Sequence, residues 1–196
     1  MSLLKQLYRV VRLPFRLVII AFNKMRFASF GHSSSIQSPL RIDGGRNIVI
    51  GDNVTVQYKT WLGALPLTGA ENAELIIEDG SIIGNFNHLF ATKRIIIHKK
   101  VLTADKVFIS DNLHEFKDVN TPILDQAIVQ NGTVEIGEGS WLGENVCVLG
   151  VNVGKHCVIG ANSVVTKNIP DYCVAVGAPA RVIKKYNEEK NVWESI

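Results

Sequence analysis

The sequence predicts an all-β solenoid in which short parallel strands follow one another through tight turns, three strands to a coil. Aliphatic residues recur every six positions, as in "IGEGSW" and "LGENVC", which run from Ile136 to Cys147. Self-similarity at a fixed period indicates a solenoid, and so short a period suits strands better than paired helices. We expect the first aliphatic residue of each hexad to point inward and to stack ~4.8 Å from its equivalent in the next coil. Glycine and asparagine recur at the corners, where a positive φ strains them least.

The composition is that of an ordinary globular chain of 196 residues, one domain with appendages. Hydrophobic residues make up 46% and charged residues 20%. The net charge of only +3 argues little about nucleic acid, and we expect no nucleic-acid partner. The cysteines, Cys147, Cys157 and Cys173, are odd in number and lack C-x-x-C spacing. This usage argues against a disulfide framework or a zinc site and favours a reducing cytoplasm.

Residues 1–40 are predicted to form a basic, amphipathic N-terminal segment, because seven basic residues and no acidic residue precede Asp43. The apolar run "LVIIAF" is far shorter than the ~20 residues that span a bilayer, and the basic, bulky "NKMRF" after it argues against a signal peptide. We expect a helix in residues 1–30 that lies on an anionic membrane surface, or a helix that caps the solenoid or packs on a partner subunit, and the two can hold together. Both fit a cytoplasmic protein, at most peripheral on the inner face of the membrane.

The hexads extend over residues 41–176, and their C-terminal half resembles a known family. The stretch "VEIGEGSWLGENVCVLGVNVGKHCVIGANSVVTKNIPDYCVAVGAPARVI" is very similar to the coenzyme-binding half of the hexapeptide-repeat acyltransferases. The resemblance implies a left-handed parallel β-helix, acetyl-CoA as co-substrate, and a homotrimer with each active site between neighbouring subunits. Residues 177–196 are then a coenzyme-contacting segment and tail, in which we expect a short helix.

An excursion from the hexads at residues 111–133 carries the candidate catalytic residue. Its sequence, within "ISDNLHEFKDVNTPI", resembles the loop of O-acetyltransferases that modify sugars and cell-surface polysaccharides. Rigid scaffolds tend to place function on such loops. Acetyl transfer to a hydroxyl needs a base, and an imidazole, with an ordinary pKa of ~6.5, suits that role. We predict that His114 deprotonates the acceptor, with Asp111, Glu115 or Glu135 as alternative residues to orient its ring.

Two further sets of residues complete the predicted reaction site. Asn85 and Asn87 of "NFN" could bind a hydroxyl-rich acceptor, or could merely satisfy the backbone of their turn. Trp141 would form a wall of the acceptor site, as the resemblance implies, or would lie at a subunit contact. A backbone N–H of Gly143 or Glu144 would stabilise the oxyanion, because a tight turn fixes such donors in advance.

The predicted coenzyme site draws on the segments "IGANSVVTKNIP" and "GAPARVIKK". A pantetheine arm is thin and rich in amides, so it fits along backbone flanked by small residues, whereas the phosphates of the nucleotide need cations. The small residues are Gly160, Ala161 and Ser163, and by resemblance the nucleotide end contacts Thr166, Lys167 and Arg181. The alternative is that "VTKNIP" only ends the coil and that "ARVIKK" begins a solvated helix.

These residues favour an acetyl-CoA-dependent O-acetyltransferase that modifies a sugar or a cell-surface polysaccharide precursor, either a small molecule or lipid-linked. An N-acyltransferase for amino-sugars differs only in the acceptor atom, and a non-catalytic scaffold is a further alternative. A metal-dependent enzyme of the γ-type carbonic anhydrase kind needs about three converging histidines. The chain has Val119 where a second ligand would stand, so we expect no metal. The sequence does not separate the candidate acceptors, or acetyl from larger acyl groups.

Overall fold

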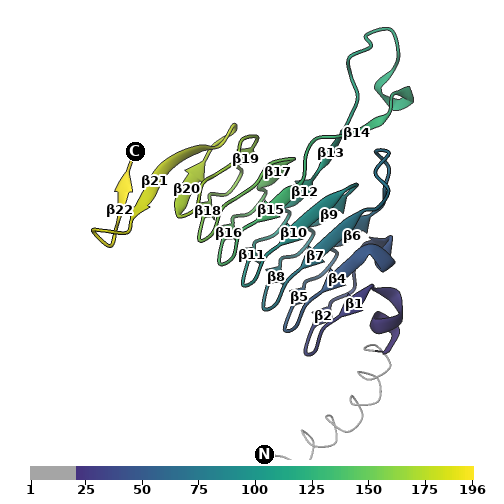
Figure 1. The fold of residues 1–196 in the computed structure, drawn as a ribbon, viewed down its shortest axis with the longest axis horizontal. Helices are drawn as coiled ribbons and strands as arrows, with labels where there is room; N and C mark the ends of the chain where they lie inside the picture. The colour runs from purple at the N-terminus through teal and green to yellow at the C-terminus, as the bar shows by residue number, and fades with distance from the viewer. Residues whose placement is uncertain (1–20) are drawn as a thin grey trace, which may run out of the picture.

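The computed structural model describes residues 21–196, and their strands wind into a three-sided coil (Figure 1). Successive strands of the coil fall on successive sides, so each side becomes a sheet of parallel strands that runs along the coil. We call these sides faces A, B and C.

The strands are short and recur on each face in chain order. Face A consists of β1 (Ser29–Phe30), β4 (Ile48–Ile50), β7 (Glu74–Ile77), β10 (Arg94–Ile97) and β15 (Val134–Ile136). Face B begins with β2 (Ser35–Ile36), β5 (Thr55–Val56), β8 (Ile82–Ile83), β11 (Leu102–Thr103), β16 (Trp141–Leu142), β18 (Val158–Ile159) and β20 (Cys173–Val176). Face C consists of β3 (Arg41–Asp43), β6 (Trp61–Ala64), β9 (His88–Ala91), β12 (Phe108–Ser110), β17 (Cys147–Leu149) and β19 (Val164–Val165). The 3-10 helices η1 (Gly45–Asn47) and η2 (Ile123–Asp125) interrupt this pattern.

Inward-facing aliphatic side chains form the core, as the hexads predict. On face A, Ile50, Ile77, Ile97 and Ile136 stand in register on neighbouring strands, and each is at most 1% exposed. Because side chains alternate along a strand, the residue next to each of these isoleucines in its strand points outward. Burial of such apolar surface stabilises the folded state by about 25 cal/mol per Å² removed from water. The predicted all-β solenoid with inward stacking is confirmed.

The corners adopt the left-handed backbone conformation, but not only at glycine and asparagine. Asn53 and Asn145 have φ values of 56° and 59°, as expected for asparagine. Phe86 and Lys100, however, have φ values of 56° and 57° at equivalent turns. Side chains with a Cβ adopt this region at some cost, so the paired strands on either side impose the conformation at these corners.

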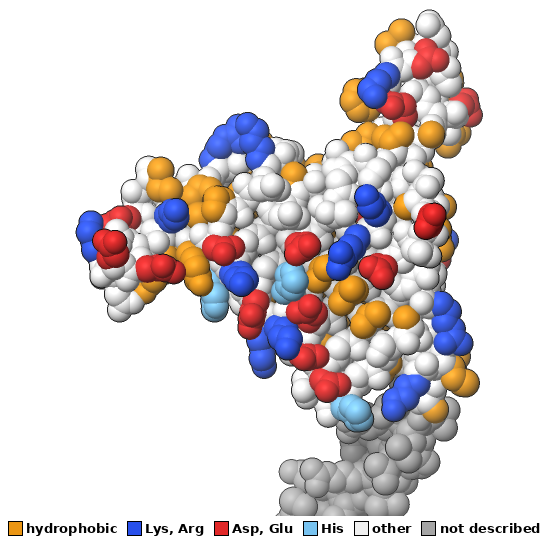
Figure 2. Space-filling view, in the orientation of Figure 1, with side chains coloured by type: hydrophobic (Ala, Val, Ile, Leu, Met, Phe, Trp, Pro, Cys, Tyr) orange, Lys and Arg blue, Asp and Glu red, His pale blue; other side chains and the backbone are white. Residues whose placement is uncertain are grey.

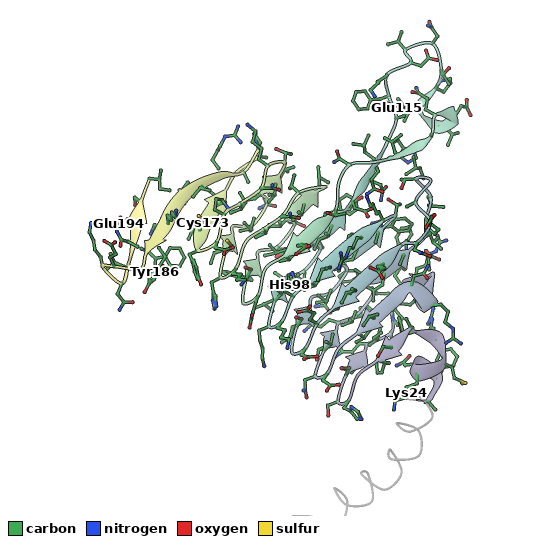
Figure 3. All side chains as sticks on the ribbon, viewed as in Figure 1. Lys24, His98, Glu115, Cys173, Tyr186 and Glu194 are labelled. Carbon is green, nitrogen blue, oxygen red and sulfur yellow. The ribbon has the colours of Figure 1, made fainter. Side chains whose placement is uncertain are left out.

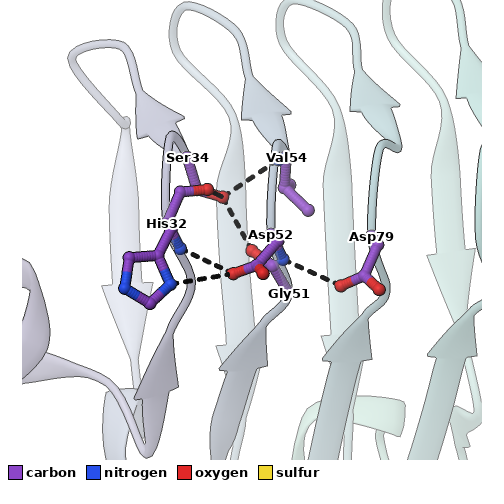
Figure 4. A network of polar contacts seen from close by, with 6 residues as sticks. All are labelled: His32, Ser34, Gly51, Asp52, Val54 and Asp79. Carbon is purple, nitrogen blue, oxygen red and sulfur yellow. Dashed lines mark hydrogen bonds and ion pairs between the residues drawn. The ribbon is translucent and has the colours of Figure 1, made fainter.

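Corner side chains tie neighbouring coils together (Figure 4). Asp52 accepts a hydrogen bond from the N–H of His32 at 2.6 Å, and Asp79 in the next coil accepts one from the N–H of Asp52 at 2.8 Å. The hydroxyl of Ser34 donates to the carbonyl of Gly51 at 2.7 Å. Backbone N–H and C=O groups at the corners that are not paired within a sheet need other hydrogen-bond partners. These short polar side chains supply them.

The C-terminal segment is a β-meander, so the predicted short helix is wrong. β21 (Arg181–Asn187) pairs antiparallel with β20, and β22 (Val192–Ser195) pairs antiparallel with β21. The last strand of the coil offers an edge to which the chain can add, and Val182 packs against the core while Arg181 and Ile183 on either side of it are exposed. The β-branched Val182 and Ile183 suit a strand.

The coil begins ahead of the predicted boundary at residue 41. β1 and β2 already pair with β4 and β5, and Phe30 is 7% exposed. Residues 21–26 are helical, and Phe27 after them is buried and stacks on Phe30 with ring centroids 5.7 Å apart. The rest of the predicted N-terminal helical segment, residues 1–20, lies outside the described residues. No helix in the described part of the chain is long and apolar enough to cross a bilayer.

Candidate active site

His114 stands on a hairpin that leaves the coil between faces C and A. After β12 the chain forms β13 (Asn112–His114) and returns as β14 (Ile128–Gln130) before β15 resumes face A. The two strands form a sheet of their own, in which His114 lies opposite Ile128. The hairpin projects away from the coil, with Glu115 on its outgoing side (Figures 1 and 3). The His114 side chain is exposed.

In the described part of the chain, none of the three carboxylates considered as orienting partners bonds to the His114 ring. Glu115 turns back onto backbone N–H groups of its own loop at 2.9 and 3.3 Å. Glu135 lies 3.0 Å from the ring of His98. Asp111 is fully buried, and its carboxylate bonds to the corner between β9 and β10. The orientation of His114 therefore depends on the hairpin that carries it.

The two asparagines predicted on the acceptor side differ in availability. Asn87 is 1% exposed, and its amide donates to the Thr103 hydroxyl at 2.7 Å and to the Gly84 carbonyl at 3.0 Å. This is the alternative interpretation, in which a corner asparagine satisfies its turn, so we leave Asn87 out of the proposed acceptor site. Asn85 is half-buried and donates to Asp105 at 3.0 Å from a corner at the surface.

Trp141 lies on the outer surface of face B, in a row of apolar side chains. It stands in register with Leu102, which stands in register with Ile82. Ile82, Leu102 and Trp141 are 39%, 44% and 47% exposed. Such a row fits either use predicted for Trp141, a wall of the acceptor site or a subunit contact.

The turn after β16 leaves one of the two predicted oxyanion donors free. The Gly143 N–H donates to the Ile159 carbonyl at 2.8 Å, so it is already used. A Cβ added at Gly143 would lie 2.7 Å from the backbone nitrogen of Ala161, which shows how closely the two coils approach. Among the described residues the Glu144 N–H has no partner, while its carboxylate accepts a bond from Lys106 at 2.9 Å that raises the pKa of this lysine. Glu144 is the donor that this turn can offer.

The small residues predicted to line the coenzyme groove lie near the end of the coil, and they are not equally accessible. Gly160 packs on β20, where an added Cβ would meet Val176 at 2.8 Å. Ala161 is exposed. Ser163 is 0% exposed, and its hydroxyl accepts the N–H of Gly177 at 3.0 Å. Ser163 therefore supports the backbone of Gly177 from within rather than offering its side chain to a ligand.

The two segments predicted to contact the coenzyme are bonded to each other. Val164 donates its N–H to the Gly177 carbonyl at 3.0 Å and accepts the N–H of Ala180 at 2.8 Å. The side chains predicted for the nucleotide end are exposed beside this junction, namely Thr166, Lys167 and Arg181. Figure 2 shows Lys and Arg side chains gathered above the C-terminal strands. Cations and small residues therefore share one end of the coil.

The side chain of His88 packs among aromatic side chains on face C. Its ring stacks on Trp61 with centroids 4.0 Å apart and lies 5.1 Å from Phe108. Burial lowers the pKa of His88, and its buried Nε2 has no hydrogen-bond partner in the described chain.

Among residues 21–196, no three His, Cys, Asp or Glu side chains gather as they would to hold a metal ion.

Sequence reasoning missed the polar residues beneath the hairpin. Thr92 and Gln130 bond to each other at 3.2 Å, and both bond to Asp111. Neither residue follows the six-residue period, so nothing in the repeat marks it. The only available signal was that Gln130 falls at the end of the excursion, where the chain must rejoin the coil.

Comparison with known proteins identifies the family. A protein-family model described as the hexapeptide repeat of succinyl-transferase matches residues 133–167. WbbJ of Escherichia coli strain K12, provisionally named a lipopolysaccharide biosynthesis O-acetyl transferase, is 36% identical over 166 residues that cover 81% of this chain and 82% of WbbJ. The chain belongs to the hexapeptide-repeat acetyltransferase family. The prediction of an acyltransferase of this family is thereby confirmed.

Solved structures agree with the fold of this acetyltransferase. A maltose O-acetyltransferase from Clostridium difficile 630 is 30% identical, with a TM-score of 0.55 over 85% of this chain and 73% of that chain. AntD, an N-acyltransferase from Bacillus cereus solved with dTDP and 3-hydroxybutyryl-CoA, has a TM-score of 0.71 over 87% of this chain and 89% of its own. Its identity is only 20%, so the likeness to AntD shows the fold alone.

Proposed function

We propose that this acetyltransferase transfers an acetyl group from acetyl-CoA to a hydroxyl of a sugar or of a cell-surface polysaccharide precursor, with His114 as the general base. The observation that carries the proposal is the exposed His114 on a hairpin that leaves the coil, in a chain of this family. The relatives support the acceptor class, since WbbJ is named for lipopolysaccharide and the C. difficile protein for maltose.

The proposed reaction needs a base and an oxyanion donor. Acetyl-CoA is a substrate and supplies the thioester. The His114 imidazole takes the proton of the acceptor hydroxyl as that oxygen attacks the thioester carbonyl carbon, and the Glu144 N–H stabilises the negative charge on the carbonyl oxygen. When the carbon–sulfur bond breaks, the imidazolium returns its proton to the departing thiolate. General base catalysis contributes about 10²–10⁴-fold, so positioning of the two substrates supplies much of the rest.

The coenzyme is proposed to lie at the C-terminal end of the coil. The pantetheine arm would run past the exposed Ala161 and the half-buried backbone of Gly160. The exposed cations Lys167 and Arg181, with Thr166, suit phosphate groups, which Arg binds bidentately and Lys as a point charge.

We further propose a homotrimer of left-handed coils, with each site built by two subunits. One chain alone leaves His114 exposed on a hairpin that projects away from the coil. The loop of that hairpin exposes Phe116, Val119 and Leu124 by 64%, 91% and 88%, and these apolar side chains are candidates for a subunit contact. Sedimentation at working concentration tests the proposal, since a monomer that is fully active would contradict it.

The decisive experiment measures thiol release from acetyl-CoA with a panel of acceptors that includes free sugars, nucleotide-sugars, polysaccharide and amino-sugars. We expect transfer to a hydroxyl acceptor, and a fall of about 10²–10⁴-fold in kcat for His114→Ala. The matched control is His32→Ala, because His32 is exposed in the first coil, away from the hairpin. A His114→Ala enzyme as active as the control would overturn the assignment, and faster transfer to amino-sugar nitrogen would replace the hydroxyl acceptor.

Peripheral membrane association through residues 1–30 is proposed as a separate property. The excess of basic residues before Asp43 supports it, as do Phe22 and Met25, which are 56% and 63% exposed. The test compares the full chain with a variant that lacks residues 1–20 and also carries Phe22→Ser and Met25→Ser, on anionic and zwitterionic vesicles. The truncation stops there because Phe27 packs in the core. Equal binding of both proteins to anionic vesicles would refute the proposal.

A further inference from the structure

A buried carboxylate at the base of the hairpin has no part in the proposed chemistry. Asp111 is 0% exposed and lies where the chain leaves β12 for the hairpin. Its Oδ1 accepts the N–H and the hydroxyl of Thr92 at 2.7 and 2.9 Å. Its Oδ2 accepts the N–H groups of Lys93 and Arg94 at 2.7 and 2.8 Å. We propose that the Asp111 carboxylate is a latch that fixes the hairpin, and with it His114, to the corner between β9 and β10.

The corner is built for an anion. Successive backbone N–H groups that converge on one point form a nest that favours negative charge, and a buried charge is tolerated only when it is paired or hydrogen-bonded. Burial alone would raise the pKa of Asp111, but the bonds from Thr92 and Lys93 outweigh it and hold that pKa below its usual value. An asparagine in this place would turn an amide N–H₂ toward N–H donors. The latch therefore needs the charge as well as the shape.

The same residue also joins the two strands of the hairpin. The Asp111 carbonyl accepts the amide of Gln130 at 2.7 Å and the N–H of Asn131 at 2.8 Å. The Gln130 side-chain oxygen in turn accepts the hydroxyls of Thr68 and Thr92 at 2.7 and 3.2 Å. The outgoing strand, the returning strand and the coil beneath them thus meet at one buried polar network.

Within residues 21–196, only polar contacts at its base join the hairpin to the coil, and besides Asp111 these are the bonds of Gln130, of Asn112 to the Phe90 carbonyl at 3.4 Å and of Asn131 to the Leu149 carbonyl at 3.3 Å. β13 and β14 pair only with each other in the described chain, and an isolated two-stranded hairpin is marginally stable in water. A displacement of about 1 Å in a catalytic group can lower the rate by about 10²-fold. Asp111 does not touch the His114 ring, so it is a positioning residue. This catalytic consequence rests on the proposed function, whereas the latch itself does not.

The experiment compares Asp111→Asn with Asp79→Asn, which makes the same change at a different corner of the coil, between faces A and B, where Asp79 accepts the N–H of Asp52. The first readout is hydrogen exchange at the Glu115 N–H, which bonds to the Ala127 carbonyl across the hairpin at 2.8 Å. In Asp111→Asn we expect this amide to exchange at least about tenfold faster while core amides of β7 keep the parent rate. Asp79→Asn is expected to leave the hairpin amide unchanged.

The second readout is kinetic. For Asp111→Asn we expect kcat to fall about 10–10²-fold, with KM for acetyl-CoA unchanged and the acid limb of the pH–rate profile at the same pH. Unchanged exchange at Glu115, or a displaced acid limb, would overturn the latch, since the latter means that Asp111 acts on the His114 ring directly. If Asp111→Asn does not fold, Thr92→Val is expected to speed exchange at the Glu115 N–H. An unchanged exchange rate in Thr92→Val would also overturn the latch. Absence of acetyl transfer in the parent protein would refute the proposed function but not the exchange result.

Discussion

Removal of one inward side chain from the coil is predicted to be strongly destabilising. Ile77 is 0% exposed and stacks between Ile50 and Ile97 of the neighbouring coils. Ile77→Ala removes three buried carbon groups worth about 0.8 kcal/mol each. It also leaves a cavity, because strand pairing holds the coils above and below at a fixed spacing. Together these effects are expected to lower the free energy of unfolding by about 2.5–5 kcal/mol.

Equilibrium unfolding in urea measures this loss, at one protein concentration because association shifts the midpoint. The matched control is Ile82→Ala, which makes the same substitution on the outer surface of face B, where Ile82 is 39% exposed. The control is expected to lower the free energy of unfolding by less than about 1 kcal/mol. If Ile77→Ala loses no more than Ile82→Ala, at equal denaturant dependence, the account of the core as inward stacks is refuted.

Burial raises the pKa of Cys157 to about 11, so its thiol is expected to resist Ellman's reagent at about pH 8 until the protein unfolds, and rapid labelling of the native protein would contradict this. Burial lowers the pKa of His88, so the unfolded state binds a proton more readily than the folded state, and stability is expected to fall as pH drops through ~6.5. His88→Gln is expected to flatten that dependence, and equal slopes in the two proteins would count against it. Gly143→Ala is expected to lower the free energy of unfolding by about 1–3 kcal/mol, because the new Cβ would lie 2.7 Å from the Ala161 backbone nitrogen, and a parental unfolding midpoint would argue otherwise.

The coil could be predicted because its energetics follow the sequence period directly. The aliphatic residue that opens each hexad, such as Ile136 or Ile159, points into the core, and both of these residues are 0% exposed. Corner residues are harder to predict, since Phe86 and Lys100 take left-handed conformations that their own preferences oppose. There the pairing of whole strands overrides local propensity. The sequence predicts a helix where the chain forms the strand β21, because "ARVIKK" has little period of its own and pairing with the open edge of β20 decides its conformation.

In the candidate site, a motif points to His114, whereas burial decides which of the other predicted side chains are accessible. His114 falls in a recognisable loop, and the structure leaves it exposed. Asn85 and Asn87 look alike in the sequence, yet one faces the surface and the other the interior. The hydrogen-bond partners of Asp111, such as Thr92 and Gln130, lie about twenty positions away in the sequence. They reach Asp111 only because two coils stack on each other. No local pattern encodes that approach.

A crystal structure of the assembled protein with coenzyme and acceptor bound tests the central claim most directly, through the distance from the imidazole of His114 to the acceptor oxygen. The account predicts a hydrogen-bonding separation of about 2.6–3.2 Å, with the same oxygen facing the thioester carbon. An imidazole turned away from both substrates, many ångströms from the acceptor in every subunit arrangement, would contradict it.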